Sequence, residues 1–276
     1  MRELFETFYR RMGNFVNVGT IDRYLPARVN WDNKLISIKG ARGTGKTTML
    51  LHHIKKSLPL NEKTLYASLD SMYFTKNDLM PVVEAFVNDG GEYLFLDEIH
   101  KYPNWSLALK NIYDDYPNLK VVFTSSSILK IYEGEGDLSR RALSYDLHGL
   151  SFREYLALTK QLNHPAISLE DILKHHVEIS HEICSKIKPI ALFKDYLKHG
   201  YYPFFKEDIK GFHQRLENTI NIILESDLPH SVKIDFGSIM KLKRLMGVVA
   251  NMVPFKPNFL KLSREIDASR GSVLHY

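Results

Sequence analysis

The stretch "GARGTGKTT", Gly40 to Thr48, constrains the fold of this 276-residue chain more than any other. It fits the pattern G-x-x-x-x-G-K followed by Ser or Thr. An apolar run typical of a strand precedes it, and a helical pattern follows it. Glycines allow a tight turn whose N–H groups point at one phosphate, and the dipole of the next helix adds partial positive charge. We therefore expect a phosphate-binding loop here, rather than a glycine-rich turn with an ordinary surface lysine.

Every residue of this loop is a candidate nucleotide contact. The nine residues are Gly40, Ala41, Arg42, Gly43, Thr44, Gly45, Lys46, Thr47 and Thr48. Lys46 is expected to neutralise the β- and γ-phosphate oxygens during catalysis, and the Thr47 hydroxyl to complete the coordination of Mg²⁺. Thr48 is the next helical residue and is expected near the base or the α-phosphate.

The run "EYLFLDEIH" ends a predicted buried strand in two carboxylates, Asp97 and Glu98. Ligands of parallel sheets bind at the carboxyl ends of the strands, so this strand end is expected beside the phosphate loop. Asp97 is the second candidate ligand of Mg²⁺. Glu98 is the candidate catalytic base that polarises the attacking water. The alternative for Glu98 is a cap for the following segment or a solvated side chain.

The identity of the nucleotide is indicated by a missing motif. Guanine-specific proteins carry N-K-x-D, whereas "TKND" at Thr75 to Asp78 holds these letters in the wrong order. A carboxylate at position 98 is also one that GTPases do not need. The expected nucleotide is therefore ATP.

Two further sets of polar residues follow the acidic strand. The run "VVFTSSS" ends in hydroxyls, of which Thr124 and Ser125 are candidates to orient the attacking water, although capping of a helix near Ile128 is an equal alternative for either one. Arg140 and Arg141 precede the last predicted strand. One of them is a candidate to stabilise transition-state charge, in its own or a neighbouring subunit, and at least one is expected to form only a surface salt bridge.

The hydrophobic pattern predicts an α/β core followed by helices. Between residues 33 and 150, apolar strands alternate with helical patterns, as in βαβ units of a parallel sheet. The predicted strands are Leu35 to Lys39, Thr64 to Asp70, Tyr93 to Asp97, Leu119 to Ser125 and Ala142 to Leu147. From Ser151 onward only helical periodicity remains. The expected divisions are a helical segment at 1–32, a nucleotide-binding core at 33–150, a helical lid at 151–230 and a further region at 231–276.

Composition argues against a membrane-spanning or secreted protein and gives little indication of a nucleic-acid partner. The chain is 44% hydrophobic, which is enough for real cores, and no apolar run reaches the roughly 18 residues of a membrane span. The N-terminus lacks the apolar core of a signal peptide, and the single Cys184 agrees with a reducing compartment, so a cytoplasmic location is expected. The net charge of +5 is spread along the chain and indicates a nucleic-acid partner only weakly.

The order of these motifs resembles the AAA+ superfamily of P-loop ATPases. It is most similar to an uncharacterised prokaryotic group that joins a P-loop ATPase to a C-terminal winged helix and often a nuclease-like domain. Four segments carry the resemblance. They are "ISIKGARGTGKTTML", "YLFLDEIHKYPNWSLALKNIYDDYPNLKVVFTSSS", "DLSRRALSYDLHGLSFREYL" and "HGYYPF".

The resemblance implies a P-loop NTPase sheet of order 5-1-4-3-2, with "LSFREYL" leading from the core into the lid. It favours Arg141 over Arg140 as the arginine that reaches phosphate. Relatives carry glycine where this chain has Ser125 and Arg140, and many AAA+ proteins carry, at Ser68, an Asn that restrains the catalytic glutamate. These departures predict slow or conditional hydrolysis.

The C-terminal run "LKLSREIDASRGSVLHY" looks like a helix-turn-helix, with a first helix ending near Ala268 and a second opening at Ser272. In the group it resembles, such a unit begins a winged helix. Here only about one turn of the recognition helix is present, which predicts a truncated winged-helix region. The alternative is a terminal helical hairpin that covers the lid.

The sequence as a whole predicts Mg²⁺-dependent binding and hydrolysis of ATP coupled to conformational change. A homo-oligomer is an expected partner, and DNA is an expected partner of a longer parent chain. The alternative function is a nucleotide-dependent, DNA-associated regulator or switch with slow hydrolysis. An interaction scaffold with a vestigial site is a further alternative.

Overall fold

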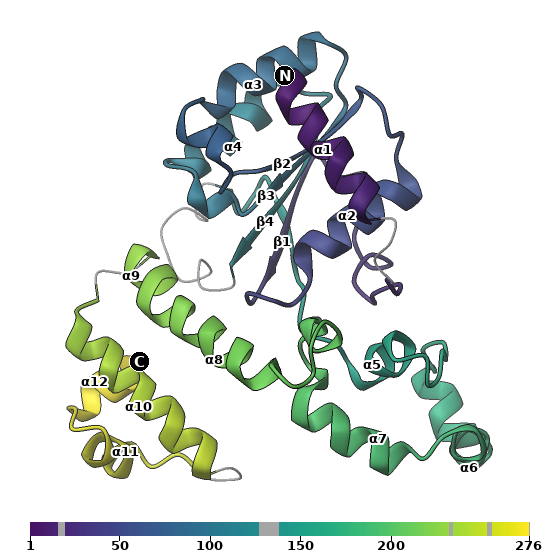
Figure 1. Ribbon diagram of the computed structural model, residues 1–276, viewed down its shortest axis with the longest axis vertical. Coiled ribbons are helices and arrows are strands. Elements are labelled where there is room, and N and C mark those ends of the chain that lie inside the picture. The colour runs from purple at the N-terminus through teal and green to yellow at the C-terminus, as the bar shows by residue number, and fades with distance from the viewer. Residues whose placement is uncertain (16–19, 127–137, 232–233, 253–255, 276) are drawn as a thin grey trace. The chain divides into compact units, whose positions relative to one another are not determined.

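The computed structural model describes residues 1–15, 20–126, 138–231, 234–252 and 256–275 (Figure 1). The chain divides into two compact units, residues 1–213 and residues 214–276. None of the helices in these ranges is long and apolar enough to cross a membrane.

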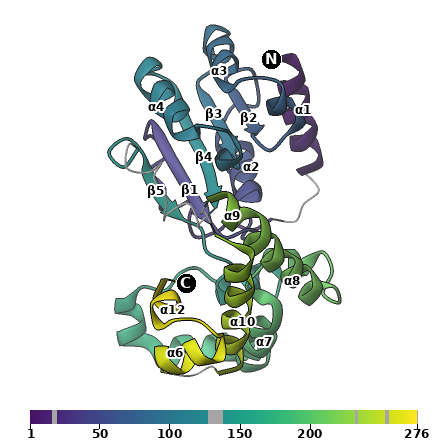
Figure 2. The ribbon, with the colours of Figure 1, turned by 90° about the vertical axis from the view of Figure 1, so that its left-hand side faces the viewer.

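The first unit is built on a sheet of five parallel strands (Figure 2). The strands are β1 (Leu35–Gly40), β2 (Thr64–Ser68), β3 (Tyr93–Asp97), β4 (Lys120–Ser126) and β5 (Leu143–Asp146). Their order is β2-β3-β4-β1-β5, which is the predicted order 5-1-4-3-2 counted from the other edge. The predicted α/β fold with a P-loop NTPase sheet is therefore confirmed. The strand predicted to reach Asp70 ends at Ser68, where the chain enters a turn closed by a hydrogen bond from Ser71 N–H to the Ser68 carbonyl.

Helices cover both faces of this sheet (Figure 1). The helices α1 (Arg2–Phe15) and α2 (Lys46–Ser57) share one hydrophobic cluster with alternate strand residues such as Ile36 and Phe95. The helices α3 (Leu79–Asn88) and α4 (Trp105–Asp115) share the other cluster, with their strand neighbours Leu35 and Leu94. Adjacent residues of a strand point to opposite faces, so strands buried on both faces must be apolar nearly throughout.

A helical segment follows the last strand within the same unit. It comprises α5 (Phe152–Leu158), α6 (Leu169–Lys186), α7 (Pro189–Asp195), a π-helical turn at Tyr196–Gly200 and a 3₁₀ helix at Pro203–Lys206. The start of α5 is set by a capping box, in which Ser151 and Glu154 satisfy each other's backbone N–H groups. Two further 3₁₀ helices, Met72–Thr75 and Ile99–Lys101, follow β2 and β3.

The C-terminal unit is helical throughout its described residues. The chain runs through α8 (Phe212–Ile222), a π-helical turn at Ile223–Asp227, α9 (Leu228–Ser231), α10 (Phe236–Met252), α11 (Phe259–Glu265) and α12 (Arg270–His275). The side chains of Leu262, Ile266 and Val273 form its small buried cluster. The last helix begins at Arg270 rather than at Ser272, because Ser269 accepts a hydrogen bond from Ser272 N–H and so caps the helix two residues earlier than predicted.

Candidate functional site

The loop after β1 has a backbone conformation that requires its glycines. Gly43 and Gly45 have φ angles of 83° and 91°, in the left-handed region that side chains disfavour. A Cβ atom on Gly40 would lie 2.4 Å from the carbonyl oxygen of Leu147. These three positions of the loop are therefore glycines for steric reasons, and they allow the chain to turn directly from β1 into α2.

Lys46 is held against this loop. Its Nζ atom donates to the carbonyl oxygens of Gly40 at 2.9 Å and Ala41 at 3.3 Å, and the residue is only 6% exposed. Thr44 closes the turn from inside, because its hydroxyl also donates to the Ala41 carbonyl, at 2.9 Å. A buried cation thus stands at the N-terminus of α2, where the helix dipole already favours an anion.

Asp97 is the centre of a hydroxyl cluster at the carboxyl end of β3. This carboxylate is 2% exposed and accepts hydrogen bonds from Thr47 Oγ1 at 2.6 Å, from the Tyr66 hydroxyl at 2.6 Å and from Thr124 Oγ1. Burial and the nearby Asp97 raise the pKa of Tyr66, so this phenol remains a donor at neutral pH. The predicted metal ligands Thr47 and Asp97 are therefore in direct contact, although 50 residues separate them.

Glu98 lies beside this cluster in a strained conformation. Its φ of 54° is unusual for a residue with a side chain, and its N–H donates to Thr124 Oγ1 at 2.9 Å. The Glu98 Oε2 atom lies 3.3 Å from His100 Nε2. Burial is the main cause that raises the pKa of Glu98; the charges of Asp97 and Asp70 act in the same direction, and those of Lys46 and Arg42 oppose them.

The two hydroxyls predicted to orient water are placed differently. Thr124 joins Asp97 to the backbone of Glu98. Ser125 is also buried, but it follows Thr124 in β4, so its side chain points to the opposite face of the sheet. Ser127 and the helix expected near Ile128 lie outside the described residues.

Ser68 pairs with β3 but does not contact Glu98 among the described hydrogen bonds. The backbone register places it opposite Asp97. Its hydroxyl donates to the nearby Asp70 carboxylate instead. The position at which many AAA+ proteins carry an asparagine is thus occupied by a side chain paired within its own turn.

Arg141 lies away from the phosphate loop of its own chain. Its guanidinium pairs with Asp114 at 3.1 Å, near the end of α4, and lies over the ring of Tyr113. It precedes β5, whose residues align with β1 from Ile36 onward, so it is at the amino edge of the sheet. The loop follows the carboxyl end of β1, roughly 17 Å away at about 3.3 Å per residue. Arg140 is exposed in the turn before it.

One cavity joins the phosphate loop to the helical segment. Its volume is about 540 Å³, within the usual range for a small-molecule site. Its lining comes from residues 20–23, the phosphate loop, the start of α2, Glu98 and the helical segment. The residues are Thr20, Ile21, Arg23, Arg42, Gly43, Gly45, Lys46, Thr47, Thr48, Met49, His52, Glu98, Leu150, Leu158, Pro203, Phe204, Lys206 and Glu207.

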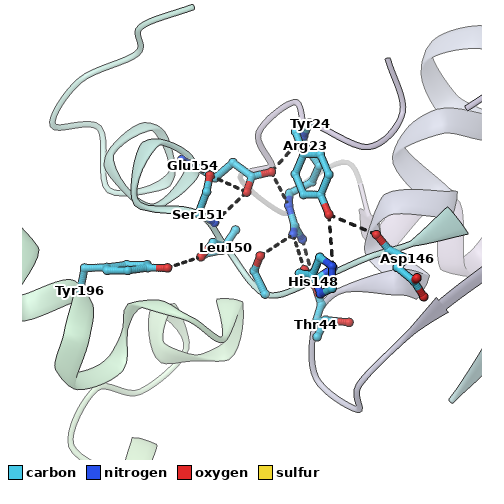
Figure 3. Close-up of polar contacts among 10 residues, drawn as sticks. Arg23, Tyr24, Thr44, Asp146, His148, Leu150, Ser151, Glu154 and Tyr196 are labelled. Carbon is cyan, nitrogen blue, oxygen red and sulfur yellow. Dashed lines mark hydrogen bonds and ion pairs between the residues drawn. The ribbon is translucent and has the colours of Figure 1, made fainter. Parts of the chain in front are cut away.

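Sequence reasoning missed several residues of this site. Arg23 precedes the sheet, and its guanidinium donates to the Thr44 carbonyl at 2.9 Å (Figure 3). Phe204 approaches Gly43 so closely that a Cβ there would lie 3.0 Å from its ring. His100 faces Glu98. The motif "HGYYPF" was a signal for Phe204, whereas no sequence pattern pointed to Arg23.

Comparison with known proteins finds a match over the same core. Residues 32–156 match a family model described as "AAA domain". The chain is also 29% identical over 268 residues to the uncharacterized protein MJ1637 of Methanocaldococcus jannaschii, a match that covers 92% of this chain and 56% of that protein. The chain thus spans little more than half the length of this curated relative.

Solved structures give weaker likenesses. The ADP complex of Hsp104 from S. cerevisiae has a TM-score of 0.43 at 18% identity, covering 93% of this chain and 39% of that one. AMPPCP-bound DnaA from Aquifex aeolicus has a TM-score of 0.38 at 14% identity, covering 99% and 86%. Likenesses at these TM-scores support no argument about function. The family match over residues 32–156 and the observed sheet order, in contrast, confirm the resemblance to AAA+ P-loop ATPases.

Proposed function

We propose that this chain binds Mg²⁺ and ATP at the phosphate loop and hydrolyses the nucleotide. The observation that carries the proposal is the position of Glu98, a partly buried carboxylate on the wall of the cavity that Lys46 and Thr47 also line. Binding alone needs only the loop and a metal ligand. A second carboxylate adjacent to Asp97 is of use when water must be activated.

Phosphate binding is supported by the loop. Residues at the start of α2 line the cavity, and the N–H groups of a first helical turn have no partner within the helix, so we propose that they add to the charge of Lys46 in binding phosphate. Lys46 donates to loop carbonyls, which are weaker acceptors than phosphate oxygens. We propose that its Nζ atom moves from these carbonyls to the β- and γ-phosphates when ATP binds.

The residues present fit Mg²⁺. Thr47 and Asp97 place a hydroxyl and a carboxylate oxygen 2.6 Å apart, and hard oxygen donors of this kind are the ligands that Mg²⁺ prefers. When bound, the ion would neutralise charge on the phosphates. Thr47, in contact with Asp97, and the adjacent Lys46 thus bring the metal and phosphate contacts to one end of the sheet.

Glu98 is proposed as the general base. A base works best with a pKa close to the operating pH, and burial moves the pKa of Glu98 upward in that direction. Its backbone is held by Thr124, which we propose as the residue that positions both carboxylates, and its side chain by His100. With Ser68 bonded to Asp70, no described contact from β2 restrains Glu98, which supports slow or conditional hydrolysis.

Arg141 is proposed to act in a neighbouring subunit. Within its own chain it lies at the amino edge of the sheet, paired with Asp114, and so lies away from the cavity. The amino edge of one copy could meet the carboxyl edge of another in a homo-oligomer. Specific ATPase activity should then rise with protein concentration, and Arg141→Ala should remove that rise.

The test of the proposed function compares two variants. Glu98→Gln should bind a fluorescent ATP analogue with Mg²⁺ as the parent does and lose turnover by about 100-fold or more, the lower end of the usual effect of a general base. Lys46→Ala should lose binding, because the loop then lacks its cation. Turnover of Glu98→Gln at the parental rate would show that another group activates water. Absence of analogue binding by the parent would overturn the proposed function as a whole.

A further inference from the structure

A single arginine side chain connects the phosphate loop to the start of the helical segment. Arg23 Nη1 donates to the carbonyl oxygen of Thr44 at 2.9 Å. Thr44 lies between Gly43 and Gly45, the two left-handed residues of the loop. The orientation of the Thr44 peptide decides which way the N–H of Gly45 points. Arg23 therefore holds the part of the loop on which phosphate binding depends.

The same guanidinium makes its other contacts to the chain that leaves the sheet (Figure 3). Nη2 donates to the carbonyl oxygens of His148 at 2.8 Å and Gly149 at 3.2 Å, and Nε donates to Glu154 Oε1 at 2.8 Å. The Arg23 side chain is 8% exposed and that of Glu154 is 3% exposed. A planar guanidinium can serve several acceptors at once in a fixed geometry, which a lysine ammonium cannot do.

Glu154 carries this connection into α5. Its carboxylate also accepts from Tyr24 N–H at 2.9 Å and from the N–H and hydroxyl of Ser151, at 2.8 and 2.9 Å. Burial by itself would raise the pKa of Glu154, but Arg23 and these hydrogen bonds hold it below its ordinary value, so the group is ionised at neutral pH. The cavity lining does not include Glu154.

The far end of the helical segment also contacts the loop. Phe204 packs over Gly43, and Pro203 lies 3.6 Å from the place where a Cβ atom of Gly45 would be. Between these ends, the Tyr196 hydroxyl donates to the Leu150 carbonyl at 2.7 Å (Figure 3). The loop is thus held from two sides by one helical segment, at Arg23 through Glu154 and at Gly43 through Phe204.

We infer that Arg23 is a positioning residue that couples nucleotide occupancy of the phosphate loop to the helices that begin at α5. The coupling works in both directions, because a loop adjusted by phosphate changes the bonds of Arg23 to Glu154, and a shift of α5 changes the loop. This inference rests on the proposed binding of nucleotide at the loop. It adds that nucleotide binding at the loop affects the helical segment through the buried ion pair of Arg23 and Glu154.

The discriminating variant is Glu154→Gln, because Glu154 contacts the loop only through Arg23 among the described residues. Glutamine keeps the size of the side chain and removes the charge that holds the guanidinium. Ser151→Ala is the matched control, since it perturbs the same helix start and leaves the Arg23–Glu154 pair intact. Arg23→Lys keeps the positive charge but removes the planar guanidinium that donates to several acceptors at once. Each variant is measured in the full chain for affinity toward a fluorescent ATP analogue with Mg²⁺ and for unfolding in urea.

We expect Glu154→Gln and Arg23→Lys each to weaken analogue binding by about fivefold or more, the lower end of typical couplings between sites. The double variant should be no weaker than the worse single variant, because both changes interrupt one connection. Ser151→Ala should bind as the parent does. In hydrogen exchange, the analogue should protect residues 152–206 in the parent and protect them less in Glu154→Gln.

Two outcomes would overturn the inference while leaving the proposed function intact. The first is parental affinity and parental protection in folded Glu154→Gln. The second is additive losses in the double variant, which would mean that Arg23 and Glu154 act separately. If either single variant fails to fold, the other decides by the same readouts. Failure of the parent to bind the analogue would overturn the proposed function and this inference together.

Discussion

Two buried carboxylates lie near the phosphate loop, and they are stabilised in opposite ways. Asp97, at the carboxyl end of β3, accepts its described hydrogen bonds from three hydroxyl groups. Glu154, at the start of α5, forms an ion pair with Arg23 and accepts further hydrogen bonds from Ser151 and Tyr24. Both side chains are almost completely buried.

Because of this difference, Asp97 can replace its hydrogen-bond donors with a bound cation, whereas Glu154 cannot. Hydroxyl donors around Asp97 can yield to a cation without leaving an unpaired charge behind. The Arg23–Glu154 pair cannot be opened in this way, since burying either ion alone is costly. We therefore expect changes at Asp97 to affect function and changes at the Arg23–Glu154 pair to affect stability as well.

The largest expected effect is that of Arg23→Ala. Removing the guanidinium leaves Glu154 buried without its cation, and breaking a buried pair in this way costs about 3 kcal/mol or more of unfolding free energy. Urea unfolding measures this loss. Arg2→Ala is the control, because Arg2 forms a surface pair with Glu6 and its side chain is 93% exposed. Equal stability of the two variants would show that Glu154 does not depend on its buried ion pair, and the contrast with Asp97 would be lost.

Asp97→Asn should affect activity more than stability. An amide can still accept hydrogen bonds from Thr47 and Tyr66, so the fold should remain, but the charge that attracts a divalent cation is lost. We expect turnover to fall by about 100-fold at a given Mg²⁺ concentration, in line with the several kcal/mol that metal ions contribute to catalysis. A titration of ATPase activity with Mg²⁺ measures the effect. Asp32→Asn, at a position whose side chain is 93% exposed, should leave the titration unchanged.

The smallest expected effect is on the pH dependence of stability. The pKa of Glu154 is lowered in the fold, so its contribution is present above the unfolded pKa and lost as pH falls through the folded one. The pKa of Glu98 is raised, so its contribution is present below the unfolded pKa and lost as pH rises through the folded one. The two dependences oppose each other in the parent.

Glu98→Gln sharpens this contrast. The variant should gain stability relative to the parent as pH rises from about 4 toward 7, because only the parent then carries a buried carboxylate that must ionise. Unfolding in urea at several pH values measures the difference. A difference that shrinks with rising pH would contradict the raised pKa of Glu98.

Much of the sheet could be predicted from the sequence. The five strands have nearly uninterrupted apolar runs because both faces of the sheet are buried, and such runs are readable without a structure. The loop residues and Asp97 could be predicted as well, because they follow or end strands and the carboxyl ends of parallel strands lie at the same edge of a sheet. The same topology places Arg141, just before β5, at the amino edge of the sheet.

Other contacts could not be predicted. Arg23 and Glu154 are 131 residues apart, and neither belongs to a spacing pattern that would indicate the other as its partner. His100 stands two residues after Glu98, but only the left-handed backbone at Glu98 and the 3₁₀ turn that follows bring the two side chains together. The tail "HKYPNW" therefore contributes a contact to the site that the motif by itself did not indicate.

By itself, the sequence determined the positions of the strands along the chain, the phosphate loop and the adjacent carboxylates, because these depend on local periodicity and on residues that few conformations tolerate. Only the tertiary structure decided which buried groups neutralise one another. Hydrogen bonds such as Tyr66 to Asp97 and ion pairs such as Arg23 to Glu154 depend on where distant segments meet in space, and burial makes each of these contacts matter.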